Sequence, residues 1–281
     1  ARGLGRRWGR GDEVVVTELD HHANVAPWVT MAAERGMTVR TVPMDPRTGT
    51  LDPKALEKAI GLRTRLVAIG AASNALGTIT DVREVTHRAL GVGALTFVDA
   101  VHLAPHVLPD VAALGCDFLA CSPYKFYGPH LGVLWGRKRL LQEVAVPKLD
   151  PAPAEAPERL ETGTQSHEAI VGAAAAIDFL AGLAPGASSR RAALLATYAT
   201  LHERASAQFE RLWAGLAALP GVRLFGLPPG SDRTPTLGFT VDGVASSAVA
   251  RTLAEAGLYV SHGDFYAATV IERLGLGPEG L

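Results

Sequence analysis

The chain is poor in cysteine and in long apolar stretches. It has only two cysteines among 281 residues, Cys116 and Cys121, which are too few for a disulfide framework or a cysteine-based zinc cluster. Both lie in or beside an apolar run, where a reduced thiol packs as a small hydrophobic group, so we expect a cytoplasmic protein. No apolar run reaches the length of a membrane span, so we expect no membrane partner.

An excess of charge of one sign is also missing. Lysine and arginine number 27 against 28 aspartates and glutamates, which gives a net charge of −1. Proteins that hold a phosphate backbone need a positive surface, so we expect no nucleic-acid partner. Hydrophobic residues make up 48% of the chain, enough for a sizeable core, and its length allows one large domain or two ordinary ones.

Short apolar runs alternate with helical segments through the first half of the chain. The predicted strands cover residues 13–19, 38–43, 65–71, 94–98, 117–121 and 132–136. The predicted helices among them cover residues 25–35, 52–60 and 80–90. Apolar strands joined through helices indicate an α/β fold whose mostly parallel sheet has helices on both faces.

The second half predicts a different organisation. Residues 145–160 are rich in proline, alanine and glutamate, which is typical of an exposed linker. Predicted helices follow at residues 168–183 and 190–219. The remaining predicted elements are strands 222–225, 236–241 and 258–261 and helix 246–256. The sequence therefore predicts a large α/β domain over residues 1–185 and a small C-terminal α+β domain, incomplete here, over residues 186–281.

Polar residues follow four of the predicted strands by a few positions. They are His21, Asn74, Asp99 and Lys125. The carboxyl ends of parallel strands meet at one edge of a sheet, where α/β proteins bind their ligands. We therefore expect these four side chains to share one site.

Lys125 lies in an aromatic setting, SPYKFYGPH at residues 122–130, directly after a predicted strand. Burial favours the neutral, nucleophilic amine that a Schiff-base lysine needs. Asp99 precedes it on the neighbouring predicted strand, and a lysine with a carboxylate is what pyridoxal phosphate (PLP) requires. Two alternatives remain open: a surface lysine that covers apolar neighbours, or a buried salt bridge without a cofactor.

Five motifs in order resemble those of the class V aminotransferase family, and most closely its cysteine desulfurase-like branch. They are LDHHAN at residues 19–24, SNALG at 73–77, DAVH at 99–102, CSPYKFYGP at 121–129 and ETGT at 161–164. The resemblance implies a PLP-dependent lyase or transferase that acts on a small amino acid. It also implies fold type I, with a mostly parallel sheet of the seven-stranded type and a smaller C-terminal α+β domain.

The resemblance further implies roles for single residues. Lys125 matches the lysine that forms the Schiff base and moves the Cα proton, and Asp99 matches the partner of the pyridinium nitrogen. His21 matches the histidine that stacks on the cofactor ring, which makes it a second catalytic residue beside Lys125. Asn74 matches a residue near the phenolic oxygen and the substrate carboxylate.

Two more matched residues concern the cofactor phosphate. Ser122 matches a phosphate ligand, and Thr164 matches a threonine that reaches the cofactor phosphate of the neighbouring subunit, which implies a homodimer with a shared active site. From the residues alone, His21, Ser122 and Thr164 could instead be helix or strand-end caps, and Asn74 could belong to a simple turn.

The sequence departs from the family pattern at three places. His102 stands where the family has a glutamine near the phenolic oxygen, and Tyr124 stands where desulfurases usually carry histidine. The C-terminal loop that carries the sulfur-accepting cysteine of desulfurases reads SHGDFYA at residues 261–267 and has no cysteine. We therefore do not expect persulfide chemistry, and desulfuration, elimination, transamination and epimerisation stay open as reactions.

The resemblance also places two family elements outside this sequence. The phosphate-binding loop should precede Ala1, and the arginine that binds the substrate carboxylate should follow Leu281. We therefore expect the native chain to be longer at both ends.

Two functions of other classes remain as alternatives. A relative without catalytic activity could keep the fold and act as a homodimeric partner protein. A metal-dependent hydrolase could use five candidate ligands, although we expect no metal: His21, His22, Asp99, His102 and His106.

Overall fold

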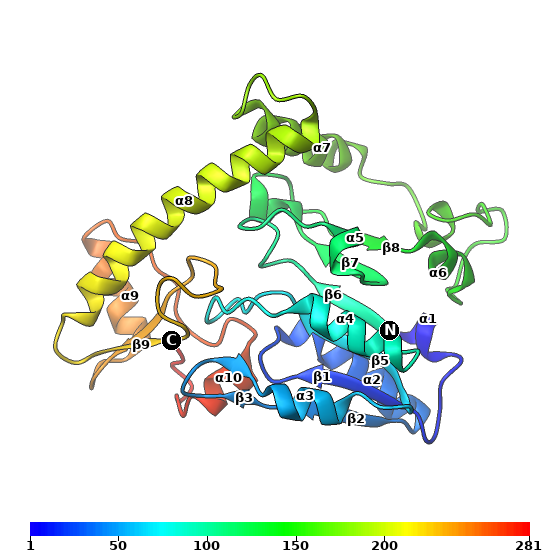
Figure 1. Ribbon diagram of the computed structural model, residues 1–281, viewed down its shortest axis with the longest axis horizontal. Coiled ribbons are helices and arrows are strands. Elements are labelled where there is room, and N and C mark those ends of the chain that lie inside the picture. The colour runs from blue at the N-terminus through cyan, green and yellow to red at the C-terminus, as the bar shows by residue number, and fades with distance from the viewer.

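A six-stranded sheet forms the centre of the computed structural model, which describes residues 1–281 (Figure 1). The strand order is β2-β1-β5-β6-β7-β8, and only the β7–β8 pair is antiparallel. The strands are β1 (Glu13–Thr17), β2 (Thr38–Val42), β5 (Thr64–Gly70), β6 (Leu95–Asp99), β7 (Phe118–Cys121) and β8 (Val133–Gly136). The mostly parallel sheet is confirmed, but it has six strands rather than seven, because the six predicted apolar runs supply all of them.

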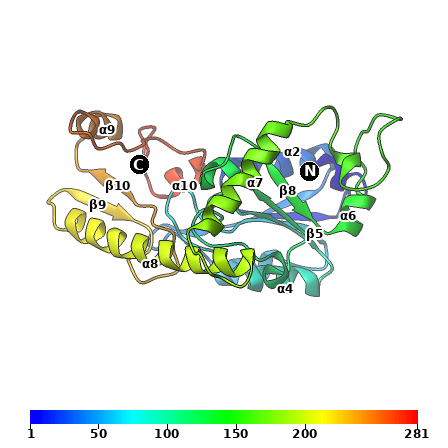
Figure 2. The same cartoon turned by 90° about the horizontal axis from the view of Figure 1, so that it is seen from above.

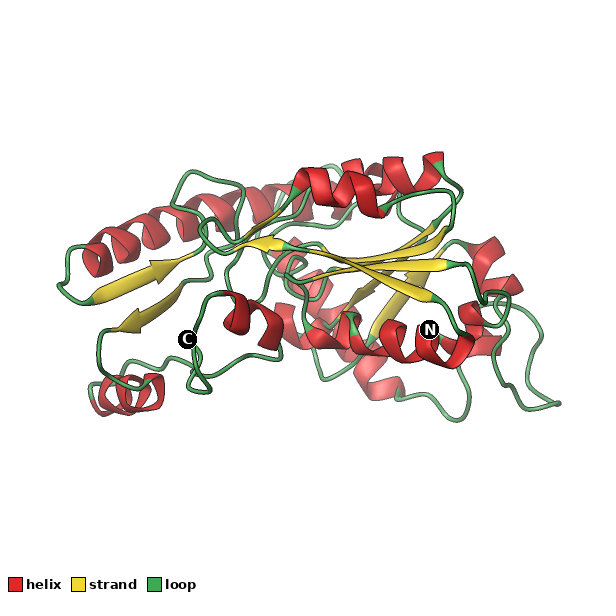
Figure 3. Ribbon diagram, turned by 90° about the horizontal axis from the view of Figure 1, so that it is seen from below, coloured by secondary structure: helices red, strands yellow, loops and turns green.

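Helices cover both faces of this sheet (Figure 3). They are α2 (Ala26–Arg35), α3 (Pro53–Ala59) and α4 (Val82–Gly91). Successive side chains of a strand point to opposite faces, so Val15 packs with Val85 of α4 in one cluster, whereas Val14 packs with Trp28 and Met31 of α2 in another. All five are almost fully buried, and each such side chain contributes roughly 1.5–3 kcal/mol.

Aspartates begin several of the helices. The side chain of Asp52 accepts hydrogen bonds from the amides of Lys54 and Ala55 at the start of α3, and Asp81 accepts one from Glu84 in α4. Such caps satisfy amides that have no partner within the helix. Eight short elements complete the first 160 residues: α1 (Arg2–Gly5), η1 (His22–Asn24), β3 (Met44–Asp45), β4 (Thr50–Leu51), α5 (Val111–Leu114), η2 (Pro123–Phe126), α6 (Lys138–Glu143) and η3 (Glu158–Leu160).

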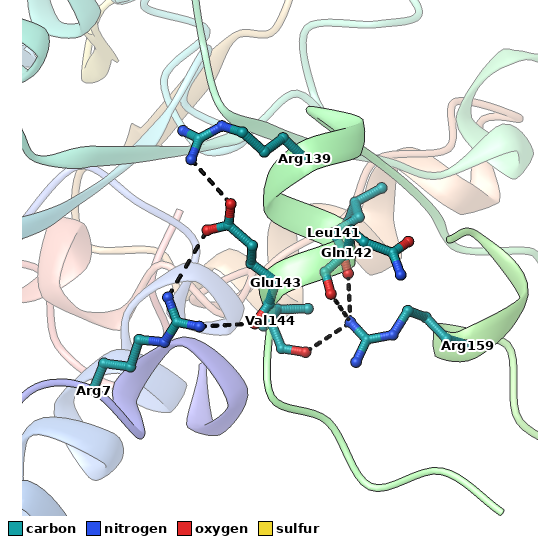
Figure 4. A network of polar contacts seen from close by, with 7 residues as sticks. All are labelled: Arg7, Arg139, Leu141, Gln142, Glu143, Val144 and Arg159. Atoms are coloured by element: carbon teal, nitrogen blue, oxygen red, sulfur yellow. Dashed lines mark hydrogen bonds and ion pairs between the residues drawn. The ribbon is translucent and has the colours of Figure 1, made fainter. Parts of the chain in front are cut away.

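The predicted linker is tied back to α6 through one arginine (Figure 4). Nη1 of Arg159 donates to three carbonyls at the C-terminal end of α6, at 2.6–2.9 Å. These carbonyls belong to Leu141, Gln142 and Val144. Glu143, the last residue of α6, forms ion pairs with Arg139 of the same helix and with Arg7 near the start of the chain. Part of the expected linker is therefore a fixed C-terminal cap of α6.

The C-terminal part contains the long helix α8, which contacts both α7 and β9 (Figure 2). Its elements are α7 (His167–Gly182), α8 (Arg190–Ala217), β9 (Val222–Phe225), β10 (Gly238–Val241), α9 (Ser246–Glu255) and α10 (Ala268–Arg273). Strands β9 and β10 form an antiparallel pair. The predicted strand at residues 258–261 is wrong, because this segment finds no neighbouring strand and Tyr259 is 87% exposed.

The end of the chain packs against the sheet edge. Val270 and Ile271 of α10 and the next residue after it, Leu274, share one buried cluster with Leu19 and Leu76, which follow β1 and β5. This packing brings the loop before α10 to the carboxyl end of the strands. None of the helices has both the length and the apolar character needed to cross a membrane.

Asp20 is a buried carboxylate that joins three elements at this edge. It accepts hydrogen bonds from the Thr17 hydroxyl, the Gly70 amide and the Asn24 amide group, at 2.8–2.9 Å. Burial raises the pKa of Asp20 to about 7, although these hydrogen bonds oppose the shift. The protein therefore holds a proton on Asp20 that the unfolded chain has already released at pH 5–6.

The stability of the fold should consequently depend on pH through Asp20. Since the folded pKa is raised, the contribution of Asp20 is complete at low pH and is lost as pH rises from about 4 to about 7, at on the order of 1.4 kcal/mol per pH unit. In urea titrations across this range, Asp20→Asn should remove that slope. The exposed Asp242→Asn control should keep it. Equal slopes in wild type and Asp20→Asn would contradict the assignment.

Candidate active site

A cavity of about 930 Å³ lies at the carboxyl edge of the sheet and collects most of the predicted site residues. Six of the seven line it: His21, Asn74, Asp99, His102, Ser122 and Lys125. They follow β1, β5, β6 and β7, which are neighbours in the sheet, so the parallel topology places them together. Thr164 is exposed and does not line this cavity.

Asp99 and Lys125 face this cavity without pairing with each other. Asp99 ends β6, and Oδ1 accepts a hydrogen bond from the amide of Val101 at 2.9 Å. No lysine or arginine nitrogen lies within ion-pair distance of the Asp99 carboxylate, so the salt-bridge alternative is wrong. Burial raises the pKa of Asp99, while His21 and Lys125 oppose the shift.

Lys125 is exposed toward the cavity rather than buried among the aromatic residues. Its Nζ lies 5.3 Å from the centre of the Tyr124 ring, within the range of a cation–π contact. It belongs to η2, a short turn that starts directly after β7, and the backbone of Tyr127 ends this turn with φ +67°. The turn therefore presents the amine at the strand end.

His21 both caps a turn and lines the cavity. Nδ1 accepts a hydrogen bond from the amide of Ala23 at 3.0 Å, which begins η1. Its ring lies 5.5 Å from the ring of Tyr266, at 39° between the planes. Burial lowers the pKa of His21, with Asp99 opposing the shift, so the ring favours the neutral form. His21 therefore does both things that the sequence suggested: it caps a short helical turn, and it lines the cavity.

The loop before α10 closes one side of the cavity. Asn74 donates through Nδ2 to the carbonyl of Phe265 at 2.9 Å, and the amide of His22 donates to the carbonyl of Tyr266 at 2.7 Å. Phe265 and Tyr266 adopt left-handed backbone angles, with φ +54° and +55°. Both residues line the cavity, which the sequence analysis missed, because it examined this loop only for cysteine.

Asn74 also leaves an acceptor free. Its Oδ1 is buried and has no hydrogen-bond partner in the protein. A buried acceptor without a partner is costly, so this oxygen fits a donor supplied by a bound molecule. Its turn, closed by the amide of Gly77 on the carbonyl of Ser73, fixes the side chain beside the cavity.

The structure does not support the alternative that Ser122 and Thr164 act as caps. Ser122 stands at the start of η2, but its side chain makes no capping hydrogen bond, so its hydroxyl is free beside the cavity. Ser166, not Thr164, stands at the start of α7.

The five candidate metal ligands do not converge. The rings of His102 and His106 lie 5.5 Å apart, but no three or more histidine, cysteine, aspartate or glutamate side chains are arranged to hold a metal ion. Burial lowers the pKa of His102 to about 3, so its ring is neutral. The metal-dependent alternative therefore has no ligand set.

Neither cysteine lines the cavity. Cys116 is fully buried, and Cys121 is half-buried at the end of β7. Burial raises the pKa of both thiols, and Asp99 adds to the shift at Cys121. Both groups therefore favour the neutral thiol, which is a poor nucleophile.

The residues that line the cavity fit pyridoxal phosphate. An amine, a carboxylate without an ionic partner, a neutral imidazole and a free hydroxyl come from Lys125, Asp99, His21 and Ser122. The free Oδ1 of Asn74 adds an acceptor that the protein itself does not satisfy. These groups match the lysine, the pyridinium partner and the polar contacts that the cofactor needs.

Comparisons with known proteins identify a family for this chain. The model of the family described as Aminotransferase class-V matches residues 1–278. A probable cysteine desulfurase from Pseudomonas aeruginosa is 38% identical over 286 residues, which cover 98% of this chain and 67% of that protein. A cysteine desulfurase from Dickeya dadantii is 36% identical over 230 residues, which cover 77% of this chain and 52% of that protein.

A solved structure also matches the fold. The apo structure of a cysteine desulfurase from Thermococcus onnurineus superposes with a TM-score of 0.87 at 29% identity, over 98% of this chain and 68% of that one. The chain thus spans between half and about two thirds of the length of these relatives. The matches confirm the resemblance, the fold type and PLP as the cofactor of the family.

Proposed function

Because the chain belongs to the class V aminotransferase family, we propose that it is a PLP-dependent enzyme acting on a small amino acid, with Lys125 as the residue that binds the cofactor. The observation that carries the proposal is that the Lys125 amine and the unpaired Asp99 carboxylate share one cavity. A buried carboxylate without an ionic partner is unfavourable in the protein alone. A cationic ring nitrogen in this cavity would remove that cost.

The residues divide the work by their chemistry. Pyridoxal phosphate, when bound, supplies a ring that withdraws electrons from the Cα of the substrate. Asp99 would keep the ring nitrogen protonated, and His21 would cover the ring face. As a free amine, Lys125 would move the Cα proton, a step to which a positioned acid or base contributes about 10²–10⁴-fold.

The reaction we propose needs no thiol from the protein. The loop at residues 261–267 has no cysteine, and its Tyr266 lines the cavity. The named relatives are cysteine desulfurases or probable cysteine desulfurases, and the matches cover 77–98% of this chain. We therefore infer elimination, transamination or epimerisation at a small amino acid rather than transfer of sulfur to the protein.

Borohydride reduction tests the role of Lys125. After incubation with PLP and reduction, peptide mapping by mass spectrometry should find the cofactor on Lys125. Lys125→Ala should lose this adduct and, with it, about 10²–10⁴-fold of the turnover. The exposed Lys54→Ala is the matched control and should keep both. An adduct on another lysine, or none in the wild type, would refute the assignment.

A screen of L-amino acids tests the reaction class. Keto acid, ammonia or D-isomer should form from at least one small amino acid, and Cys121→Ser should leave the rate within about twofold, because Cys121 does not line the cavity. Sulfide production from cysteine that Cys121→Ser abolishes would show persulfide chemistry and overturn the inference. No product from any amino acid would instead favour the non-catalytic partner protein.

We also propose a homodimer in which two chains complete each site. Helix α7 keeps large apolar side chains in solvent: Val171 is 68% exposed and Phe179 is 55% exposed. Tyr127, next to the Lys125 turn, is 74% exposed and lies 5.9 Å from Phe179, ring centre to ring centre. Contiguous apolar groups of this kind mark interfaces. Thr164 is exposed just before this helix, where it would reach the site of a second copy.

Charge introduced on α7 tests the dimer. In light scattering after size exclusion, Phe179→Asp should weaken self-association by at least about 100-fold, because an unpaired carboxylate would become buried. Leu212→Asp on α8 is the matched control, since Leu212 is 53% exposed and equally apolar. A monomeric wild type would refute the proposal, as would a Phe179→Asp variant that associates like Leu212→Asp.

Two further assignments are proposals of the same kind. The cytoplasmic location is supported by two cysteines that form no disulfide. The division into a cofactor-binding domain over residues 1–185 and a smaller domain over residues 186–281 is supported by the separate β9–β10 sheet.

A further inference from the structure

The His102 ring is held from one side by two threonine hydroxyls from a distant part of the chain. Its Nε2 lies 2.8 Å from Oγ1 of Thr236 and 3.1 Å from Oγ1 of Thr234. These residues follow His102 by more than 130 positions, in the segment that leads into β10. The other ring nitrogen, Nδ1, makes no hydrogen bond within the protein and is not enclosed by it, and His102 lines the cavity.

The two hydroxyls also contact each other, which orders their protons. Thr234 donates to Oγ1 of Thr236 at 3.2 Å, so the Thr236 hydroxyl keeps its own proton for Nε2 of His102 at 2.8 Å. The reverse order would end on the carbonyl of Gly77 at 3.4 Å, and this carbonyl already accepts the Thr234 amide at 2.8 Å. The 3.4 Å contact is the longer of the two and its acceptor already has a partner, so the first order is favoured.

A buried arginine fixes the segment that carries both threonines. Arg233 donates through its guanidinium to the carbonyls of Leu76, Thr234 and Thr236. Its guanidinium carbon lies 4.2 Å from the centre of the Phe209 ring on α8. These hydrogen bonds to the carbonyls of residues 234 and 236 hold the backbone that carries the two hydroxyls beside His102.

From this arrangement we propose that Thr236 is a positioning residue, which holds His102 as the tautomer with its proton on Nδ1. A neutral imidazole carries one ring proton, and Nε2 accepts from Thr236, so Nδ1–H becomes a donor that faces the cavity. This donor suits an anionic oxygen on the cofactor ring. The last step rests on the proposed function, whereas the tautomer itself rests only on the contacts of His102.

Nitrogen NMR of the histidine rings tests the tautomer without any cofactor. Long-range proton–nitrogen spectra distinguish a protonated Nδ1 from a protonated Nε2, and His102→Gln identifies the signal by its loss. Wild type and Thr236→Ser should both show His102 with the proton on Nδ1, because serine keeps the hydroxyl. Thr236→Val, which has nearly the same shape, should shift the signal toward a mixture. A wild-type proton on Nε2 would overturn the inference.

Titration with pyridoxal phosphate tests what the donor does. Thr236→Val should weaken the Kd about 3–10-fold, the equivalent of one hydrogen bond, and Thr236→Ser should stay within about twofold. Equal Kd values for wild type and Thr236→Val would refute the role toward the cofactor. Wild type that fails to bind PLP would instead refute the proposed function, and the NMR result on the tautomer would still stand.

Discussion

The Asp99 carboxylate sets the main constraint on this structure. It is held in a largely buried place by the amide of Val101, and no basic side chain of the chain lies within ion-pair distance. A group of this kind is stable only as the neutral acid or with a positive partner from outside the protein. The pairing of β6 with β7 places Asp99 and the Lys125 turn at the same cavity. We propose that a cationic ring bound in this cavity is that partner.

The loop before α10 depends on the same edge of the sheet. Its two left-handed residues keep their conformation because Asn74 and the amide of His22 occupy their carbonyls and α10 packs against the core. Such backbone conformations cost of order 1–3 kcal/mol each and persist only where the surroundings enforce them. A loop tied down in this way suits an aromatic wall of the cavity better than a mobile nucleophile that travels to a substrate.

The sequence predicted those parts of the site that depend on local patterns. Apolar runs located six strands, and parallel strands end at one edge, so His21, Asn74, Asp99 and Lys125 were expected together. The contacts of His102 with Thr234 and Thr236 could not be predicted, because they join segments more than 130 residues apart and follow no local motif. The strand at residues 258–261 failed for a related reason: strand pairing depends on a neighbour that a single run cannot reveal.

A histidine at residue 102 makes different demands on the surrounding protein from those of an amide side chain. A glutamine amide always carries donors, whereas a neutral imidazole donates from one nitrogen only, and the choice of nitrogen is set by its other contacts. Thr234 and Thr236 supply that choice here as a directed pair of hydroxyls, and Arg233 fixes their segment through the carbonyls of Leu76, Thr234 and Thr236. We therefore expect residue 102 to be coupled to residues 233–236, so that a variant in this segment changes the proton that His102 presents to the cavity.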